Sequence, residues 1–185
     1  AETLLQGIKR LAEAYGGNVE YAPDGAYRES PDVAIYVFGE KPYAEFRGDL
    51  TTLDFKPGDR TDLQTIQKLK QSGIPVITVF LSGRPLWINP ELNSSDAFIA
   101  AFLPGSQSGA IADLIFQDSN ASHDFDFTAK LPFSWPEHAD QYLLNHGDAD
   151  YLPLFPYGFG LSLGDTCTLG RLHENSLATE PDHGT

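Results

Sequence analysis

The chain has 185 residues, of which 41% are hydrophobic, so it is long enough to bury the core of one domain. Twelve Lys and Arg stand against 26 Asp and Glu, and the net charge of −14 argues against binding to nucleic acid or to an anionic membrane surface. The single cysteine, Cys167, excludes an internal disulfide, and the five histidines lack the spacing of a metal site. The sequence contains no run of about 18 apolar residues, which a membrane-spanning helix would need. We therefore expect a soluble domain without metal or cofactor, and the lack of Met indicates a processed or excised piece.

The first part of the chain predicts a helix followed by strands. Apolar residues recur at helical spacing over residues 4–12, and Gly16-Gly17 is a plausible stop. Residues 18–21 are compatible with a short strand. Residues 32–38 form a continuous β-branched and aromatic run, which is typical of a strand buried on both faces, as in a parallel sheet.

The rest of the chain continues this alternation. Thr61 or Asp62 is a candidate cap for a helix that ends before Gly73, and the apolar run 74–81 predicts the next strand. A third apolar run covers residues 97–103, and residues 107–116 predict another helix. Alternating strands and helices indicate an α/β fold with a mainly parallel sheet. From about residue 120 the chain is rich in aromatics, Pro and Gly, which predicts loops and short strands.

The loop after the strand 32–38 is the best candidate site, because ligands of open α/β sheets bind beyond the carboxyl ends of the strands. It carries two glutamates, Glu40 and Glu45, with Lys41, Tyr43 and Arg47 close in sequence. Such groups suit general acid chemistry, since neighbouring charges tune a carboxyl group. The alternative interpretation is a solvated loop whose charges pair locally.

Five segments resemble, in order, the C-terminal domain of the family 3 glycoside hydrolases. They read Gly-Glu-Lys-Pro-Tyr-Ala-Glu-Phe-Arg-Gly-Asp at 39–49, Leu-Ser-Gly-Arg-Pro-Leu at 81–86, Ala-Phe-Leu-Pro-Gly-Ser-Gln-Ser-Gly at 101–109, Phe-Thr-Ala-Lys-Leu-Pro-Phe-Ser-Trp-Pro at 127–136 and Phe-Pro-Tyr-Gly-Phe-Gly-Leu-Ser at 155–162. The resemblance implies a three-layer α/β sandwich over residues 1–164. Residues 165–185 then form a polar C-terminal extension.

The chain departs from the family pattern at three points. Gln107 stands where relatives usually have Glu, and Ala129 stands where Gly is usual. The family's (β/α)8 barrel, with the Ser-Asp-Trp motif that carries the nucleophile, is not in this sequence. Ser95-Asp96-Ala97 is interpreted as a connection from a helix to a strand, so the chain holds no nucleophile.

The resemblance implies that the chain supplies one of the two carboxyl groups of a retaining glycosidase, the acid/base. By resemblance that residue is Glu40, and Glu45 is the second choice, because Glu45 has the alternative role of holding Arg47, Lys41 or the loop.

Other residues are candidates for positioning the loop or the substrate. Arg84 is placed to anchor a loop carboxylate as a bidentate partner, or is simply a structural residue of its turn. Tyr43 and Phe46 are candidates to stack on a sugar at the leaving-group side, or to pack within the loop. Trp87 and Trp135 are expected in the core.

The leading functional hypothesis is the acid/base domain of an exo-acting β-glucosidase or β-glucanase. Its partners are a β-glucoside or β-glucan substrate and the N-terminal barrel of the same enzyme, and a periplasmic or secreted location is favoured. No cofactor is predicted, because neither a Gly-x-Gly-x-x-Gly run nor a Walker lysine is present. The competing hypothesis is a carbohydrate-binding or structural scaffold without catalytic groups.

Overall fold

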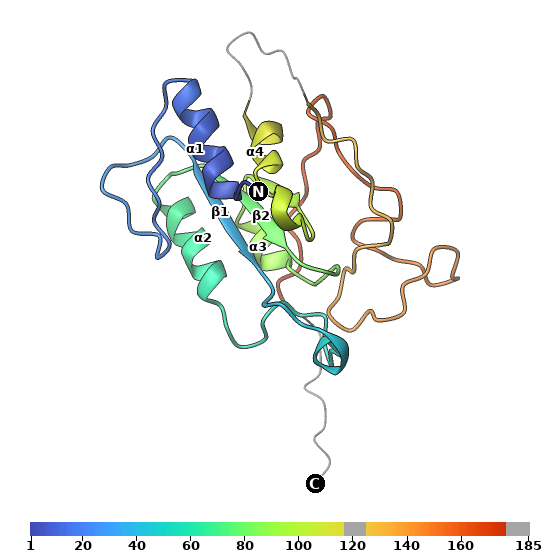
Figure 1. The fold of residues 1–185 in the computed structure, drawn as a ribbon. Coiled ribbons are helices and arrows are strands. Elements are labelled where there is room, and N and C mark those ends of the chain that lie inside the picture. Colours follow the sequence, from blue (N-terminus) through green and yellow to red (C-terminus); the bar gives the residue numbers. More distant parts are fainter. Residues whose placement is uncertain (117–124, 177–185) are drawn as a thin grey trace.

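A computed structural model describes residues 1–116 and 125–176 (Figure 1). Its sheet has three strands, β1 (Ala34–Gly39), β2 (Val76–Leu81) and β3 (Ala97–Ala100). They pair in parallel in the order β1-β2-β3, so Phe38 lies beside Phe80, and Phe80 beside Ala100. The mainly parallel α/β fold expected from the sequence is confirmed.

Helices cover both faces of this sheet. The α-helices are α1 (Leu4–Ala14), α2 (Thr61–Gln71), α3 (Asn89–Asn93) and α4 (Ala110–Ile115), and two 3-10 turns are η1 (Glu45–Gly48) and η2 (Gly105–Gln107). Buried residues of α1 and α4 pack on one face of the sheet, and those of α2 and α3 pack on the other. The molecule is therefore the three-layer sandwich that the resemblance implied.

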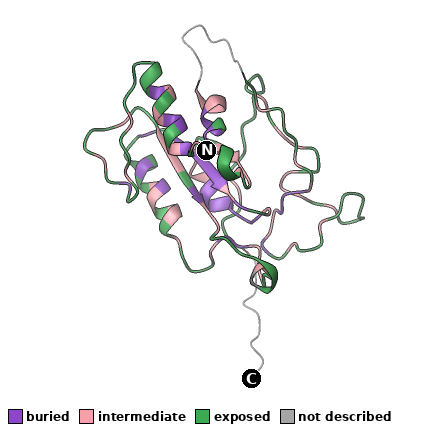
Figure 2. Cartoon of the chain, in the orientation of Figure 1, coloured by how far each residue is buried: buried purple, intermediate pink, exposed green. Residues whose placement is uncertain are grey.

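Side-chain alternation along the strands divides the core into two halves. Phe38 and Phe80 point toward α2 and α3, where their ring centroids lie 5.0 Å apart and Phe55 meets Phe80 edge-on at 5.2 Å. Val79 points the other way and packs with Ile8 of α1. Figure 2 shows this buried region running along the sheet between the helices. The half on the side of α2 and α3 contains more buried residues, and the C-terminal part of the chain packs against it through Trp135, Phe155 and Leu172.

We call residues 125–176 the C-terminal arm, because they run over the core almost without regular structure (Figure 1). Trp135 fastens the arm: its indole Nε1 donates to the carbonyl of Leu86 at 2.9 Å, and its ring is buried beside Phe98. A single antiparallel bridge joins Trp135 to Phe155. The expected core positions of Trp87 and Trp135 are thus confirmed.

Several strand predictions need correction. β3 ends at Ala100 instead of continuing to residue 103, and the described residues after 124 show an isolated bridge where short strands were expected. Residues 18–21 do not form a strand. The first strand covers Ala34–Gly39 and is not buried on both faces, since the Val37 side chain is 40% exposed. The physical reason is that β1 lies at one edge of the sheet formed by the described residues, so helices cover only part of its outer surface.

The helix predictions also differ in detail. The N-cap of α2 is Arg60, not Thr61 or Asp62, and the carboxylate of Asp59 accepts the Thr61 amide at 3.0 Å instead. The predicted helix 107–116 is shorter and begins at Ala110, after η2. The short helix α3 was not predicted, and it leads through Ser95 and Asp96 into β3, as expected of that connection.

The predicted polar extension 165–185 is only partly described. Leu172 packs against the core, and its amide donates to the side chain of Asn93 at 2.9 Å. Residues 177–185 lie outside the described part. No helix within the described ranges has both the length and the apolar character needed to cross a membrane.

Candidate active site

The carboxyl ends of β1 and β2 lie side by side and start the candidate site. Gly39 pairs with Leu81, and the amide of Glu40 donates to the Leu81 carbonyl at 3.0 Å. A Cβ on Gly39 would lie 2.0 Å from that carbonyl oxygen, so only glycine permits this approach. The loop that begins at Glu40 is therefore directed toward the turn that follows β2.

Glu40 is fastened to this turn through both carboxylate oxygens. Ser82 Oγ donates to Oε2 at 2.5 Å, and Arg84 Nη2 and Nε lie 2.9 Å and 3.1 Å from Oε1. The Glu40 side chain is only 13% exposed. Charge-assisted hydrogen bonds of this kind are stronger than neutral ones. Glu40 thus acts in the structure as a largely shielded anchor of the loop.

Arg84 connects this anchor to the far end of the loop. Besides Glu40, its guanidinium donates to the backbone carbonyl of Gly48. The same group lies over the ring of Tyr43, with 3.9 Å between the guanidinium carbon and the ring centroid. A Cβ on Gly83 would lie 2.6 Å from the Tyr43 hydroxyl, so Tyr43 is packed tightly against the turn. We call residues 40–48 the carboxylate loop; it closes around Arg84.

Glu45 has a different environment in the same loop. It is exposed, it opens η1, and its backbone has φ of 48°, in the left-handed region that non-glycine residues rarely adopt. Its side chain forms no hydrogen bond or ion pair with side chains that the structure describes. The next residue, Phe46, has an 86% exposed side chain despite being apolar. This tip of the carboxylate loop faces solvent.

The structure brings three of the predicted site residues together. Arg84 contacts both Glu40 and Tyr43, whereas Glu45 and Phe46 lie at the exposed tip. No ion pair joins Glu45 to Lys41, and the side chain of Arg47 is outside the described part.

Sequence reasoning missed Ser82, which donates to Glu40 and accepts the Arg84 amide at 3.2 Å. Its position two residues before Arg84, in the turn 81–86, was the available signal.

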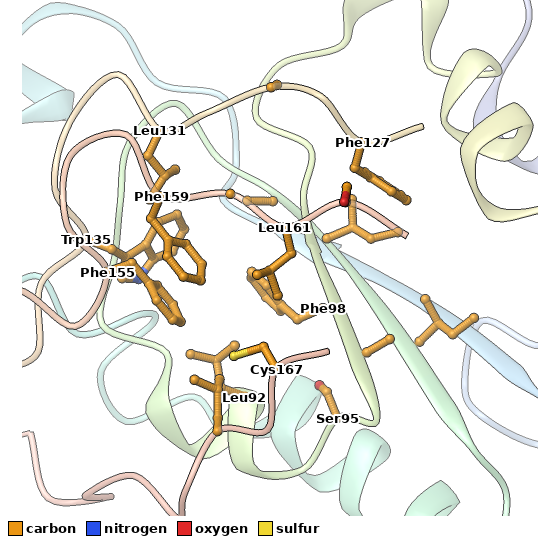
Figure 3. Close-up of a pocket in the computed structure, with 18 of the residues that line it drawn as sticks. Leu92, Ser95, Phe98, Phe127, Leu131, Trp135, Phe155, Phe159, Leu161 and Cys167 are labelled. Atoms are coloured by element: carbon orange, nitrogen blue, oxygen red, sulfur yellow. The ribbon is translucent and has the colours of Figure 1, made fainter. Parts of the chain in front are cut away.

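A separate cavity of about 1090 Å³ lies between β3 and the C-terminal arm (Figure 3). Its wall is mainly aromatic and aliphatic and includes Phe98, Leu131, Trp135, Phe155, Phe159 and Leu161. The acidic groups that line it are engaged: Asp96 pairs with Lys70, and Asp126 accepts the amides of Phe127 and Leu163. This cavity offers mainly apolar surface, and the carboxylate loop does not line it.

The described residues hold no cluster of three or more His, Cys, Asp or Glu side chains that would suit a metal ion. The fold and the carboxylate loop together define a class: an α/β sandwich that presents a carboxylic acid beyond the carboxyl edge of a parallel sheet.

Comparison with known proteins identifies the family within that class. The chain belongs to the glycosyl hydrolase family 3 C-terminal domain family, whose model matches residues 1–163. This confirms the resemblance inferred from the five segments.

Relatives of known structure and sequence agree with this assignment. An exo-1,3/1,4-β-glucanase from a Pseudoalteromonas species is 46% identical, with a TM-score of 0.92, over 95% of this chain and 22% of that one. A periplasmic β-glucosidase of Salmonella typhimurium is 31% identical over 71% of this chain and 19% of its own length. A lysosomal β-glucosidase of Dictyostelium discoideum is 32% identical over 72% and 16%, respectively. The chain thus spans about a fifth of the length of these proteins.

Proposed function

We propose that this chain is the acid/base-donating domain of a retaining, exo-acting β-glucosidase or β-glucanase. In this proposal the substrate is a β-glucoside or β-glucan, and the nucleophile comes from the family's (β/α)8 barrel. Membership of family 3 and the similarity to an exo-1,3/1,4-β-glucanase support the substrate class. The similarity to a periplasmic β-glucosidase supports a periplasmic or secreted location.

Within the carboxylate loop we assign the acid/base role to Glu45 rather than to Glu40. A general acid must carry a proton and reach the leaving oxygen. Both oxygens of Glu40 already accept hydrogen bonds, from Ser82 and from the Arg84 guanidinium. Both carboxylate oxygens of Glu40 are thus engaged by groups of the same domain. This engagement of Glu40 supports the choice of Glu45, which the sequence had placed second.

Glu45 is the more accessible of the two glutamates. It is exposed at the tip of the loop, and the closed loop holds it in a left-handed conformation. In the first step its carboxylic acid protonates the leaving oxygen while the barrel nucleophile attacks the anomeric carbon. In the second step its carboxylate takes a proton from the water that releases the sugar. Retention requires the two carboxyl groups to lie about 5–5.5 Å apart.

We assign the aromatic residues of the loop to two different tasks. Phe46 follows Glu45 directly and has its ring exposed, so it is placed to stack on the apolar face of the leaving-group sugar. The face of Tyr43 is occupied by Arg84, which assigns Tyr43 to holding the loop. Arg47, which follows Phe46 in the chain, is a further candidate for binding the substrate or for positioning the loop.

The test compares Glu45→Gln with Glu40→Gln in the enzyme that carries this chain together with its barrel. Glu45→Gln is expected to lower kcat/KM by about 10²–10⁴-fold for substrates with poor leaving groups, because these need the proton. The kcat/KM for 2,4-dinitrophenyl β-glucoside is expected to change little. If Glu40→Gln shows this leaving-group dependence instead, the assignment within the loop is wrong. If neither variant does, the scaffold hypothesis is supported.

A further inference from the structure

Arg84 contacts three separate parts of the carboxylate loop. It pairs with Glu40 at the start of the loop, stacks on Tyr43 in the middle, and donates to the Gly48 carbonyl at the end. The Arg84 side chain is 19% exposed, so these contacts are partly shielded from water. Glu45 lies inside the segment that these contacts close.

We propose that Arg84 is a positioning residue that sets the place of Glu45, acting through both ends of the carboxylate loop. This inference rests on the proposed function of Glu45. A loop tied only at Glu40 would leave the rest of the segment free to move, whereas the second tie at Gly48, the last residue of η1, fixes both ends of the carboxylate loop. A misplacement of a reacting group by about 1 Å costs on the order of 10²-fold in rate.

Ser82 supports Arg84 in this role. Its hydroxyl donates to Glu40 at 2.5 Å and accepts the backbone amide of Arg84 at 3.2 Å. The hydroxyl therefore holds the Glu40 carboxylate close to the backbone of Arg84. Lysine at position 84 would keep the charge but lose the planar fork, which alone contacts Glu40 and Gly48 at the same time.

The backbone of Glu45 gives a reason why two ties are needed. Non-glycine residues in the left-handed region persist only where surrounding contacts enforce them. Releasing Gly48 from Arg84 removes such a contact three residues away. The loop then relaxes, and Glu45 leaves the position from which it reaches the leaving oxygen.

The test measures Arg84→Lys and Tyr43→Leu in the enzyme that carries this chain and its barrel. Each variant is assayed on a substrate with a poor leaving group and on 2,4-dinitrophenyl β-glucoside. The ratio of the two kcat/KM values does not depend on how much of the protein is folded, because the same active molecules turn over both substrates. Arg84→Lys is expected to change this ratio about 10–100-fold in favour of the activated substrate. Tyr43→Leu is expected to shift it in the same direction by a smaller factor.

The matched control is Arg60→Lys, which alters another partly buried Arg–carboxylate pair, Arg60 with Asp54, whose closest atoms are 3.2 Å apart. This control is expected to leave the ratio unchanged. An unchanged ratio in both loop variants, while Glu45→Gln changes it, would show that Arg84 is only structural. An unchanged ratio in Glu45→Gln itself would overturn the proposed function instead, so the two failures are distinguishable.

Discussion

Glu91 is a carboxylic acid in the interior of the domain. Its side chain is 2% exposed, and its Oε2 has no hydrogen-bond partner among the described residues. Burial raises the pKa of Glu91 from 4.5 to about 7, because a charge without partners is costly in the core. The Arg60 guanidinium lowers this pKa, and Asp54 raises it again. A residue outside the candidate site is thus sensitive to pH near neutrality.

We predict that Glu91→Gln stabilises the protein at pH 8. The folded state binds the Glu91 proton more tightly than the unfolded state, so the contribution of Glu91 is most favourable below pH 4.5 and declines as the pH rises to about 7. Removing the charge should raise the free energy of unfolding by up to ~3 kcal/mol at pH 8 and change it little at pH 4.

Urea unfolding at the two pH values measures this difference in stability. The exposed Glu29→Gln is the control for the loss of one negative charge. Equal stabilisation by Glu91→Gln at both pH values would contradict the burial argument.

At the scale of elements, α1 and α4 approach each other closely enough for backbone contact, in addition to the side-chain packing of Ile8 with Ile111 and the ion pair of Arg10 with Asp113. The amide of Gly109 donates to the Glu2 carbonyl at 3.1 Å, just before α1 begins. A Cβ on Gly7 would lie 2.6 Å from the Gly109 carbonyl oxygen and 3.1 Å from the Ala112 Cβ. Gly7 is therefore required by close helix packing.

We predict that Gly7→Ala lowers stability even though alanine is the better helix former. The gain in helix propensity is about 1 kcal/mol, and it opposes the cost of pushing α1 away from α4. Overpacking of this kind costs typically ~1–3 kcal/mol, so a net loss of up to about 2 kcal/mol is expected in urea unfolding. Glu13→Ala, at an exposed position of the same helix, should change stability by less than about 0.5 kcal/mol. A stabilised Gly7→Ala variant would show that the two helices can separate freely.

The carboxylate loop also illustrates what sequence reasoning can reach at the element scale. Its place after the first strand follows from a continuous apolar run that ends in Gly39-Glu40. The roles of its two glutamates do not follow from spacing. They depend on Arg84 and Ser82, which are more than 40 positions further along the chain and approach Glu40 only because β1 and β2 pair.

For the whole molecule, Trp135 is a buried contact between the sandwich and the C-terminal arm. It is 2% exposed, and its ring packs against the sheet residue Phe80 with centroids 6.4 Å apart. Its indole donates to the Leu86 carbonyl, whereas the indole of Trp87 has no hydrogen-bond partner among the described residues. Both tryptophans are buried, and they differ in that only the Trp135 indole donates a hydrogen bond, so the same substitution at the two positions isolates the contribution of that bond.

We predict that Trp135→Phe destabilises the protein by about 1–3 kcal/mol more than Trp87→Phe. The first change leaves the buried Leu86 carbonyl without its partner, and the second removes a donor that has none. Thermal unfolding compares the two variants, and limited proteolysis should cut within the arm faster in Trp135→Phe. Equal losses would mean that ring volume, rather than the hydrogen bond, fastens the arm.

The general architecture could be predicted from the sequence, whereas the short helix α3 and the edge position of β1 could not. Three apolar runs and the helices between them predict the parallel sandwich, because fully buried strands need no alternation. The helix α3 escaped notice because it has five residues, Pro90 near its start and no helical periodicity. Val37 was expected to be buried because the run around it is apolar, and nothing in that run marks β1 as an edge.

The closed carboxylate loop has a consequence for engineering. Gly39 fixes where the loop leaves the sheet, and the contacts of residues 82–84 fix where it ends. The carboxylate loop and the turn 82–84 therefore form two segments that have to be exchanged together. Transplanting both parts between members of the family should preserve the direction of the tip. Residues 41, 42, 44 and 46 can then be varied as a library, in which new leaving-group preferences are sought while the anchor stays constant.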